Sequence, residues 1–587
     1  MPFAKPFALS RLALSIAAGA LLGASHAPPS PEAALDQLVA RLSLRDRAAQ
    51  LVMPWIPGSY ASADDPGSAI VLRWIDSLHV GGIIVSVGSP VDIAAKLNQL
   101  QARSRLPLLV ASDLEEGTAR RFVGGTPFPT NMGVAATGRE ADAYAMGRVT
   151  AEEARAVGIH LAFAPVADVN SNPANPIINV RSFGEDPAAV AKLVVAEVRG
   201  LQQHGVLATV KHFPGHGDTE TDSHIAMATI RADRARLDSV ELVPFRAAIE
   251  AGVAAVMSAH IAVPTLTGGE IRPATLAPSI LSGVLRESLR FRGLVVTDAM
   301  DMGGLVAGYG AAEAPVLALL AGADILLQPS NPETTIKAIV DAVRQGRLSE
   351  QRLNQSVRRV LAAKRRLGLF AKRTVPLDRV TLAVGSAEHQ AVARDVAARS
   401  IVLLQDSTGA IDSLRSRPRS LALITYAEDQ GVLPGYALTN ELRAQGDTVR
   451  VFRLWPSSGP ASYDSARALL ANGVTAVFAP AVRAMPGRGR VALPDSLVAF
   501  IEQTALVQPT VLVSLGSPYL LQQTPHVTSH LLAWSANPLS EAAAARALSG
   551  AAIGGRLPIT IPPAFPRGAG LDRPVASRVA TSTPGRR

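Results

Sequence analysis

Between residues 51 and 329, short runs of apolar, β-branched residues alternate with longer segments whose apolar positions recur at helical spacing. Continuous apolar runs of this kind are typical of parallel strands that a sheet buries on both faces. Eight such runs within about 280 residues fit a succession of eight strand–helix units. The predicted strands span residues 51–56, 81–87, 107–113, 160–168, 206–213, 254–261, 293–300 and 323–329.

Polar residues decide between a closed barrel and an open doubly wound sheet, which is the competing architecture. They gather within two residues of the carboxyl ends of different predicted strands, where a barrel carries its catalytic groups. In a purely structural sheet, polar residues would not gather at one end. We therefore predict a (β/α)8 barrel of the TIM type. The residues in question are Asp113, Asp168, Lys211, His212, His260 and Asp298.

A second α/β pattern follows a polar, helix-poor connection. Its six apolar runs predict an open α/β sandwich of about 175 residues. No nucleophile elbow, dinucleotide-binding glycine motif or P-loop follows these runs in the sequence, so we expect the chemistry in the first half. The predicted strands span residues 401–404, 421–426, 449–454, 476–480, 510–515 and 531–534. The predicted domains are a barrel at 28–375, a linker at 376–388 and a sandwich at 389–565.

The two ends of the chain differ from the body. Residues 1–27 combine basic Lys5 and Arg11 with an apolar run over 12–24 and a small-x-small cleavage sequence, which is typical of a signal peptide. The apolar run is shorter than the roughly 20 residues that a membrane-spanning helix needs, so we expect export and no membrane span after cleavage. Residues 566–587 are rich in Pro, Gly, Ser, Thr and Arg and predict a disordered basic tail.

Charge and cysteine content exclude several classes of protein. The formal net charge is +9, of which the signal peptide holds two units and the tail four. The remaining charge of +3 on the folded body gives little support to a nucleic-acid-binding surface. The chain has no cysteine, which excludes disulfides, thiolate metal sites and cysteine nucleophiles.

The densest group of chemically capable residues follows the predicted fifth strand. Residues 211–217 read Lys-His-Phe-Pro-Gly-His-Gly, and Asp222-Ser223-His224 comes shortly after. The proline and two glycines make this stretch a non-helical loop. One alternative is that the histidines are hydrogen-bonded loop residues without a chemical role, and another is that they bind a metal ion with the aspartate. Because the His-x3-His pair spans a Pro-Gly turn instead of one helix face, we expect no metal, and no cofactor.

At these residues the sequence resembles glycoside hydrolase family 3, in its β-N-acetylglucosaminidase branch. The stretches at 211–217 and 222–224 are highly specific to that branch. The resemblance runs from residue 38 to residue 561 and implies a barrel followed by a sandwich domain. It also implies exo-acting hydrolysis of terminal β-linked N-acetylglucosamine with retention of configuration, from cell-wall or chitin-type oligosaccharides. Supporting stretches lie at 181–184, 256–260, 273–276 and 293–300.

The resemblance assigns catalytic roles. Asp298, at the end of the predicted seventh strand, matches the nucleophile that forms a glycosyl-enzyme intermediate. His224 matches the general acid/base, with Asp222 bonded to its other ring nitrogen. Imidazole suits this role because it titrates near neutral pH without tuning. Asp301 is the alternative nucleophile, but it lies past the strand end, and we expect Asp298 to act.

Further residues match the family's contacts to sugar hydroxyl and acetamide groups. Residues 113–117 read Asp-Leu-Glu-Glu-Gly where the family usually has Asp-Gln-Glu-Gly-Gly, so Leu114 and Glu116 are departures. A bulky acid where the backbone usually turns tightly predicts a changed loop, with Arg121 affected more than Asp113. The implied sugar contacts are Asp113, Arg121, Arg181, Lys211 and His212, and Asp168 and His260 are expected to support the site.

Other activities stay open at this point. A β-glucosidase or β-xylosidase of the same family would take its acid/base glutamate from the C-terminal domain, and the intact histidine–aspartate pair argues against it. A β-N-acetylglucosaminide phosphorylase is an alternative because an uncharged histidine tolerates an incoming phosphate better than a carboxylate does. A non-catalytic glycan-binding protein would be expected to lack Asp298 or His224. We expect a monomer, periplasmic or extracellular, that binds a small carbohydrate or muropeptide in peptidoglycan turnover and binds no nucleic acid.

Overall fold

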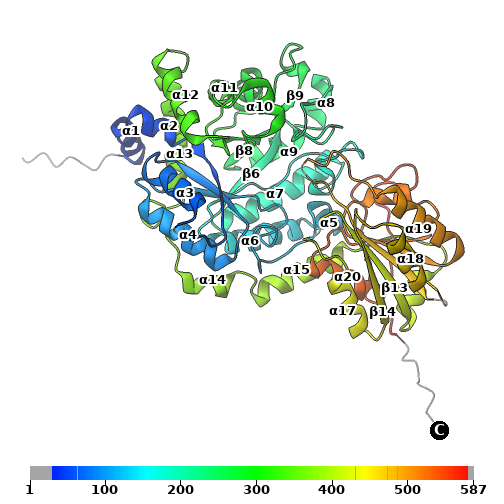
Figure 1. Cartoon of the computed structure of the whole chain (residues 1–587). Coiled ribbons are helices and arrows are strands. Elements are labelled where there is room, and N and C mark those ends of the chain that lie inside the picture. The colour runs from blue at the N-terminus through cyan, green and yellow to red at the C-terminus, as the bar shows by residue number, and fades with distance from the viewer. Residues whose placement is uncertain (1–29, 63, 430, 472–473, 486, 579–587) are drawn as a thin grey trace, which may run out of the picture.

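The computed structural model describes residues 30–578 apart from residues 63, 430, 472–473 and 486. Two α/β bodies lie side by side, the first coloured blue to green and the second yellow to red (Figure 1). The predicted signal peptide at 1–27 lies outside the described residues, as do residues 579–587.

Parallel strands close into a barrel in the first body. Its strands are β1 (Val52–Met53), β2 (Trp55–Pro57), β3 (Gly82–Ser86), β4 (Leu109–Ser112), β5 (Leu161–Ala162), β6 (Leu207–Phe213), β8 (Ala255–Ser258), β10 (Leu294–Thr297) and β11 (Leu326–Leu327). One sheet runs β10-β8-β6-β5-β4-β3-β2, while β1, just before β2, pairs with β11. A parallel bridge from Val296 to Ile325 joins β10 to the start of β11 and completes the ring. The predicted (β/α)8 barrel is confirmed.

Helices cover the outside of the barrel and begin at capping residues. Ser89, Asp186 and Asn331 each accept a backbone N–H of the turn that follows, and proline occupies the first turn of each of these helices. The α-helices are α1 (Pro31–Arg41), α2 (Leu44–Ala49), α3 (Pro66–Asp76), α4 (Pro90–Arg103), α5 (Asn131–Ala136), α6 (Glu140–Ala156), α7 (Pro187–Gln203), α8 (Arg234–Ser239), α9 (Val243–Glu250), α10 (Gly303–Tyr309), α11 (Glu313–Ala321), α12 (Pro332–Arg344) and α13 (Glu350–Arg366). The remaining short elements are β7 (Ala228–Thr229), β9 (Ile261–Ala262), η1 (Asn179–Arg181), η2 (Pro264–Leu266), η3 (Ala274–Leu276) and the π-helical η4 (Ser279–Ser288).

The second body is an open sheet whose six strands match the predicted runs. They are β12 (Val402–Asp406), β13 (Ser420–Ala427), β14 (Thr448–Leu454), β15 (Thr475–Ala481), β16 (Thr510–Ser514) and β17 (Ser529–Leu532). Their order is β12-β17-β16-β15-β13-β14, with only the β12–β17 pair antiparallel. The predicted fold class, a barrel followed by an α/β sandwich, is therefore confirmed.

Helices lie on both faces of the second sheet. Leu421 and Leu423 of β13 face one apolar core, and Ala422 and Ile424 face the other, as the two-residue period of a strand requires. The helices are α15 (Ala387–Ser400), α16 (Ala410–Ser416), α17 (Tyr436–Ala444), α18 (Pro460–Leu469), α19 (Asp495–Val507), η5 (Pro518–Gln523) and α20 (Pro538–Leu548).

The connection between the bodies is more structured than its sequence indicates. A linker is predicted at 376–388, but helix α14 (Leu377–Ala383) occupies most of it, and its Val380 is fully buried. Val380 is the one buried residue of this seven-residue helix, and so short an element gives too weak a periodic signal to be predicted from the sequence.

Specific contacts hold the second body beside the open end of the barrel. At Gly133 an added Cβ would lie 2.8 Å from Trp534 Cβ, so only glycine permits this close approach. Asn537 Nδ2 donates to the Phe128 carbonyl at 2.7 Å. The backbone N–H of Thr560 donates to a barrel-loop carboxylate, also at 2.7 Å. The loops after β4 and β5 thus serve as the platform for the second body.

The prediction of a disordered tail beginning at 566 is wrong for residues 566–578. Arg573 Nε lies 2.7 Å from Asp412 Oδ1, and Arg578 Nη1 lies 2.9 Å from the buried Asp447 Oδ2. Composition indicated a solvated segment because few residues there are apolar, but the arginines bind carboxylates that lie far away in the sequence.

In the described part of the chain, no single helix is long and apolar enough to cross a membrane. By length and composition alone, α10 and α11 meet that criterion together, as a pair bent by 101°.

Candidate active site

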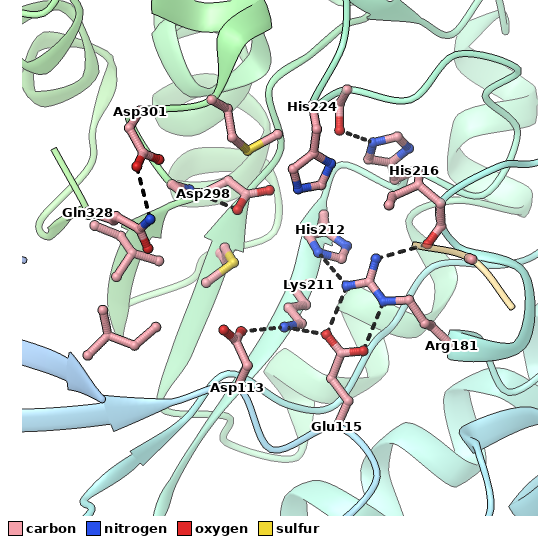
Figure 2. Close-up of a pocket in the computed structure, with 18 of the residues that line it drawn as sticks. Asp113, Glu115, Arg181, Lys211, His212, His216, His224, Asp298, Asp301 and Gln328 are labelled. Atoms are coloured by element: carbon pink, nitrogen blue, oxygen red, sulfur yellow. Dashed lines mark hydrogen bonds and ion pairs between the residues drawn. The ribbon is translucent and has the colours of Figure 1, made fainter. Parts of the chain in front are cut away.

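A cavity of about 260 Å³ opens at the carboxyl ends of the barrel strands. Figure 2 shows that its labelled side chains come from the ends of β4, β6 and β10 and from neighbouring loops. One residue of the second body, Ala484, also lines it. Every parallel strand of a barrel ends at the same opening, which is why side chains from distant segments meet there.

Asp298 is the first residue after β10, so the strand fixes it at the wall of the cavity. Its Oδ1 accepts the Ala299 N–H at 2.8 Å. Burial would raise the pKa of Asp298, but the neighbouring His212 and His260 and the Ala299 N–H outweigh it and hold the pKa below the ordinary value of 3.8. The carboxylate is therefore ionised at neutral pH, as a nucleophile must be.

His224 lies on the loop beyond β6 and lines the same cavity (Figure 2). Its Nδ1 lies 2.9 Å from Asp222 Oδ1, which also accepts the His224 backbone N–H at 2.9 Å. Asp222 Oδ2 accepts the N–H of Gly487, a residue of the second body, at 2.7 Å. Burial would raise the pKa of Asp222, but these hydrogen bonds lower it, so the charged carboxylate keeps a proton on Nδ1. Nε2 of His224 has no hydrogen-bond partner among the described residues.

Four charged side chains form a network on another wall of the cavity (Figure 2). Lys211 Nζ lies 3.0 Å from Asp113 Oδ1 and 2.7 Å from Glu115 Oε1. Arg181 binds Glu115 through Nε at 2.9 Å and through Nη2 at 2.8 Å. Burial would raise the pKa of Glu115, but Arg181 and Lys211 hold it well below its usual range. The network therefore offers charged donors and acceptors side by side, which suits a polar, uncharged ligand.

His212 follows Lys211 on β6 and is fixed from behind by Asp168. The distance from His212 Nδ1 to Asp168 Oδ2 is 2.7 Å. Asp168 Oδ1 accepts the backbone N–H of His212 at 3.1 Å and that of His216 at 2.7 Å. Burial would raise the pKa of Asp168, but His212 lowers it below the ordinary value. The other ring nitrogen of His212 lies 3.4 Å from Arg181 Nη2, so both nitrogens are engaged.

Two further histidines support the site. His216 Nε2 lies 2.9 Å from the hydroxyl of Ser223, the residue before His224. Burial lowers the pKa of His216 to about 4, so this ring is neutral and holds the loop by hydrogen bonds. His260 Nε2 lies 3.0 Å from the carbonyl of Ala299, the residue that follows Asp298.

The structure brings the sequence-predicted site residues together. Asp222 stands behind His224 and does not line the cavity, whereas all seven others do. Within the described ranges, no group of three or more His, Asp or Glu side chains has the arrangement of a metal site. The seven residues are Asp113, Arg121, Arg181, Lys211, His212, His224 and Asp298.

Sequence reasoning missed Glu115 as a member of the site. Its position two residues after Asp113, among three acids at one strand end, was the available signal. The two departures in this stretch have separate explanations. Leu114 is fully buried, and Glu116 forms an ion pair with Arg120 at 3.2 Å. A changed loop was expected to affect Arg121 more than Asp113, and both residues line the cavity.

Comparison with known families gives a match over most of the barrel. A model of the glycosyl hydrolase family 3 N-terminal domain matches residues 43–363, which is more than half of the chain.

Three named relatives are about one third identical to this chain over the segments that align. The β-N-acetylglucosaminidase/β-glucosidase of Cellulomonas fimi is 35% identical over 353 residues, 59% of this chain and 63% of that protein. β-Hexosaminidase A of Pseudoalteromonas piscicida is 33% identical over 412 residues, 66% of this chain and 64% of that protein. β-Hexosaminidase LpqI of Mycobacterium tuberculosis is 34% identical over 373 residues, 60% of this chain and 90% of that protein. The chain thus spans less than two thirds of the first two relatives.

Solved structures resemble both bodies together. A glycoside hydrolase family 3 β-N-acetylglucosaminidase from Paenibacillus sp. str. FPU-7 has a TM-score of 0.78 and 32% identity, over 89% of this chain and 99% of that one. The β-glucoside phosphorylase BglX bound to 2FGlc has a TM-score of 0.80 and 27% identity, over 90% of this chain and 96% of that one.

Proposed function

The chain belongs to glycoside hydrolase family 3, and on this premise we propose that it is an exo-acting, retaining glycosidase that removes terminal β-linked N-acetylglucosamine. The observation that carries the proposal is that an ionised Asp298 lies in the same cavity as His224. Nε2 of His224 has no hydrogen-bond partner among the described residues and is available to a ligand. A retaining glycosidase needs a carboxylate nucleophile and one group that acts first as acid and then as base. Similarity to proteins named β-hexosaminidase supports the choice of sugar.

In the first step, one oxygen of Asp298 bonds to the anomeric carbon while the bond from that carbon to the leaving-group oxygen breaks. His224, protonated on both ring nitrogens, gives its Nε2 proton to the departing oxygen. Asp222 stabilises the imidazolium because its Oδ1 lies 2.9 Å from Nδ1. The products are a free alcohol, a glycosyl ester of Asp298 and a neutral His224.

In the second step, water attacks the anomeric carbon from the opposite face and Asp298 leaves as a carboxylate. Nε2 of the neutral His224 takes a proton from the water as the new bond forms. Two inversions at the same carbon leave the configuration unchanged, and both residues return to their starting protonation states.

The charged network is the proposed binding site for the sugar. Lys211 and Arg181 donate hydrogen bonds, Asp113 and Glu115 accept them, and the four charges balance. Such a surface matches sugar hydroxyl groups, each of which donates and accepts. The cavity volume of about 260 Å³ suits one terminal sugar, which supports exo action.

A panel of aryl β-glycosides tests the proposal. The purified protein is expected to hydrolyse the N-acetylglucosaminide faster than the glucoside or the xyloside, with rates that do not depend on phosphate. Proton NMR of the first product formed should show the β-anomer. Faster cleavage of the glucoside, a sugar phosphate as the product, or an initial α-anomer would contradict the proposal.

Export and a role in peptidoglycan turnover complete the proposal. They are supported by the signal-like sequence of residues 1–27, which lies outside the described residues. Fractionation of the producing cell and N-terminal sequencing should find a mature protein that begins near residue 28 outside the cytoplasm. A mature protein that retains residues 1–27 would contradict cleavage.

A further inference from the structure

A second cavity, of about 650 Å³, lies between the two bodies. Residues that follow β13 and β15 line it. These strands are neighbours in the second sheet, yet the chain leaves β13 for β14 on one side and returns to β15 on the other. In open α/β sheets such a reversal leaves a crevice at the carboxyl ends of the two strands, and ligands commonly bind there.

Arg483, two residues after β15, lines this cavity. Its guanidinium has neither a hydrogen bond nor an ion pair with any residue in the described part of the chain. Burial lowers the pKa of Arg483 and the charge of Arg120 lowers it further, and the nearby carboxylates of Glu116, Asp429 and Glu115 raise it by less than this lowering. A partly buried guanidinium without a partner keeps its planar set of donors available for a carboxylate.

The amino-terminal end of α20 faces the same space. Asn537, Pro538 and Leu539, at the start of this 11-residue helix, line the cavity. The aligned peptide dipoles give this end of a helix a partial positive charge, which favours an anion. The helix end and Arg483 come from different elements and act on the same cavity.

Three other charged residues line the cavity, and their charges are compensated or screened. Glu116 and Arg120 form an ion pair at 3.2 Å. Asp429 is exposed, and its Oδ1 accepts the Gly431 N–H at 2.8 Å, so water and this turn satisfy it. Of the charged residues that line the cavity, Arg483 is therefore the one whose side chain bonds to no other described residue.

The two cavities are adjacent. Arg120 lines both, and Ala484, which lines the catalytic cavity, stands between Arg483 and Met485, which line the second. A substrate whose terminal sugar lies over Asp298 can therefore extend its leaving group toward Arg483. We propose that the second cavity binds a carboxylate on the leaving group through Arg483 and makes the enzyme selective for acidic oligosaccharides. This inference rests on the glycosidase activity proposed above.

Matched substrates isolate the carboxylate. Chitobiose and chitotriose are each oxidised at the reducing end to the aldonic acid or reduced at the same carbon to the alditol. Within each pair the leaving groups differ only in a carboxylate or a hydroxymethyl group. For at least one length, the wild-type kcat/KM is expected to be about tenfold higher for the acid, mainly through a lower KM, because a hydrogen bond to a charged group contributes this much.

Substitutions at Arg483 test the assignment. Arg483→Ala is expected to bring the acid-to-alditol ratio close to one, and Arg483→Lys to keep part of the preference because lysine retains the charge but not the planar fork. Arg490→Ala is the control, since Arg490 is exposed on the same loop and lines neither cavity, and it should keep the wild-type ratio. Each ratio is measured within one variant, so a partial loss of folded protein cancels.

Three outcomes would overturn the inference. They are a wild-type ratio near one at both lengths, a preference that survives Arg483→Ala, and a preference that Arg490→Ala removes equally. Failure of the proposed function would show differently. In that case the wild type would not cleave an aryl N-acetylglucosaminide, whose leaving group carries no carboxylate, and the inference would fall with the function.

Discussion

Two histidine–aspartate pairs stand at the same opening of the barrel, and they differ in what the second ring nitrogen meets. His212 is bonded to Asp168 at 2.7 Å, and its Nε2 lies 3.4 Å from Arg181. His224 is bonded to Asp222 at 2.9 Å, and its Nε2 has no partner in the described residues. The side chain of His212 is 7% exposed and that of His224 is 33% exposed.

The difference follows from the elements that carry the two pairs. His212 belongs to β6, where neighbouring strands surround it, so every polar atom must find a partner inside the protein. His224 belongs to a loop, where one nitrogen can stay open to the cavity and exchange a proton with a ligand. We therefore propose that the same local chemistry gives binding and rigidity in the His212–Asp168 pair and proton transfer in the His224–Asp222 pair.

The largest expected effect comes from the carboxylate that faces both pairs. Asp298→Ala should lower kcat by about 10⁴-fold or more because no covalent intermediate can form. Circular dichroism should show an unchanged fold. Added azide is expected to restore release of the leaving group from an activated aryl glycoside, because it enters the space of the missing carboxylate. Near-wild-type activity would contradict the nucleophile assignment.

The effect of a substitution in the His224–Asp222 pair should depend on the leaving group. His224→Ala should lower kcat/KM for chitobiose by about 10²- to 10⁴-fold, which is the range of general acid catalysis, and far less for an activated aryl glycoside. His212→Ala is the matched comparison. His212→Ala should lower kcat/KM for both substrates by a similar factor, because His212 is proposed to bind the sugar and does not transfer a proton. Equal losses from both substrates in His224→Ala would refute its role as acid.

Neutralising the carboxylate of Asp222 should have a smaller effect of the same kind. Asp222→Asn keeps the shape but removes the charge that stabilises the imidazolium, and we expect about a 10²-fold loss in kcat on chitobiose. The alkaline limb of the kcat/KM profile should move to lower pH, because removing the carboxylate charge makes it easier for the general acid to lose the proton that it donates. An unchanged profile would contradict coupling between Asp222 and His224.

Substitution in the His212–Asp168 pair should change the stability of the protein. The pKa of Asp168 is lowered in the folded protein, so its contribution to stability is complete above the unfolded value of 3.8 and is lost as the pH falls through the folded pKa. Asp168→Asn should therefore lower the apparent melting temperature at pH 7 and lower it by less near pH 3, where part of the contribution is lost. Asp168→Asn that melts like the wild type at both pH values would contradict the assignment.

Much of the site could be predicted because a barrel converts strand ends into neighbours. Asp113, Lys211 and Asp298 lie at the ends of three strands, and the parallel topology brings any such residues to one opening. The role of His216 could not be predicted in the same way. Its motif position suggests chemistry, whereas burial lowers its pKa to about 4 and leaves it as a neutral support.

Long-range partners explain the remaining differences. The backbone N–H of Gly487 donates to Asp222, which is 265 residues away in the sequence. No local sequence pattern predicts a backbone donor from another domain. The segment 566–578 looks solvated by composition, but Arg578 finds the buried Asp447. In both cases the partner is set by how two folded bodies or segments meet, which short-range periodicity does not encode.

The alternation of apolar runs and helical segments determined two α/β bodies, because the periods of strand and helix are local properties of the chain. Residue types at the strand ends determined the chemistry available, namely carboxylate and imidazole without thiol. Only the tertiary structure decided that His224 keeps an open ring nitrogen and that Arg483, in the second cavity, has no carboxylate partner among the described residues. Those properties depend on solvent access and on partners far away in the sequence, which exist only after the two bodies have packed together.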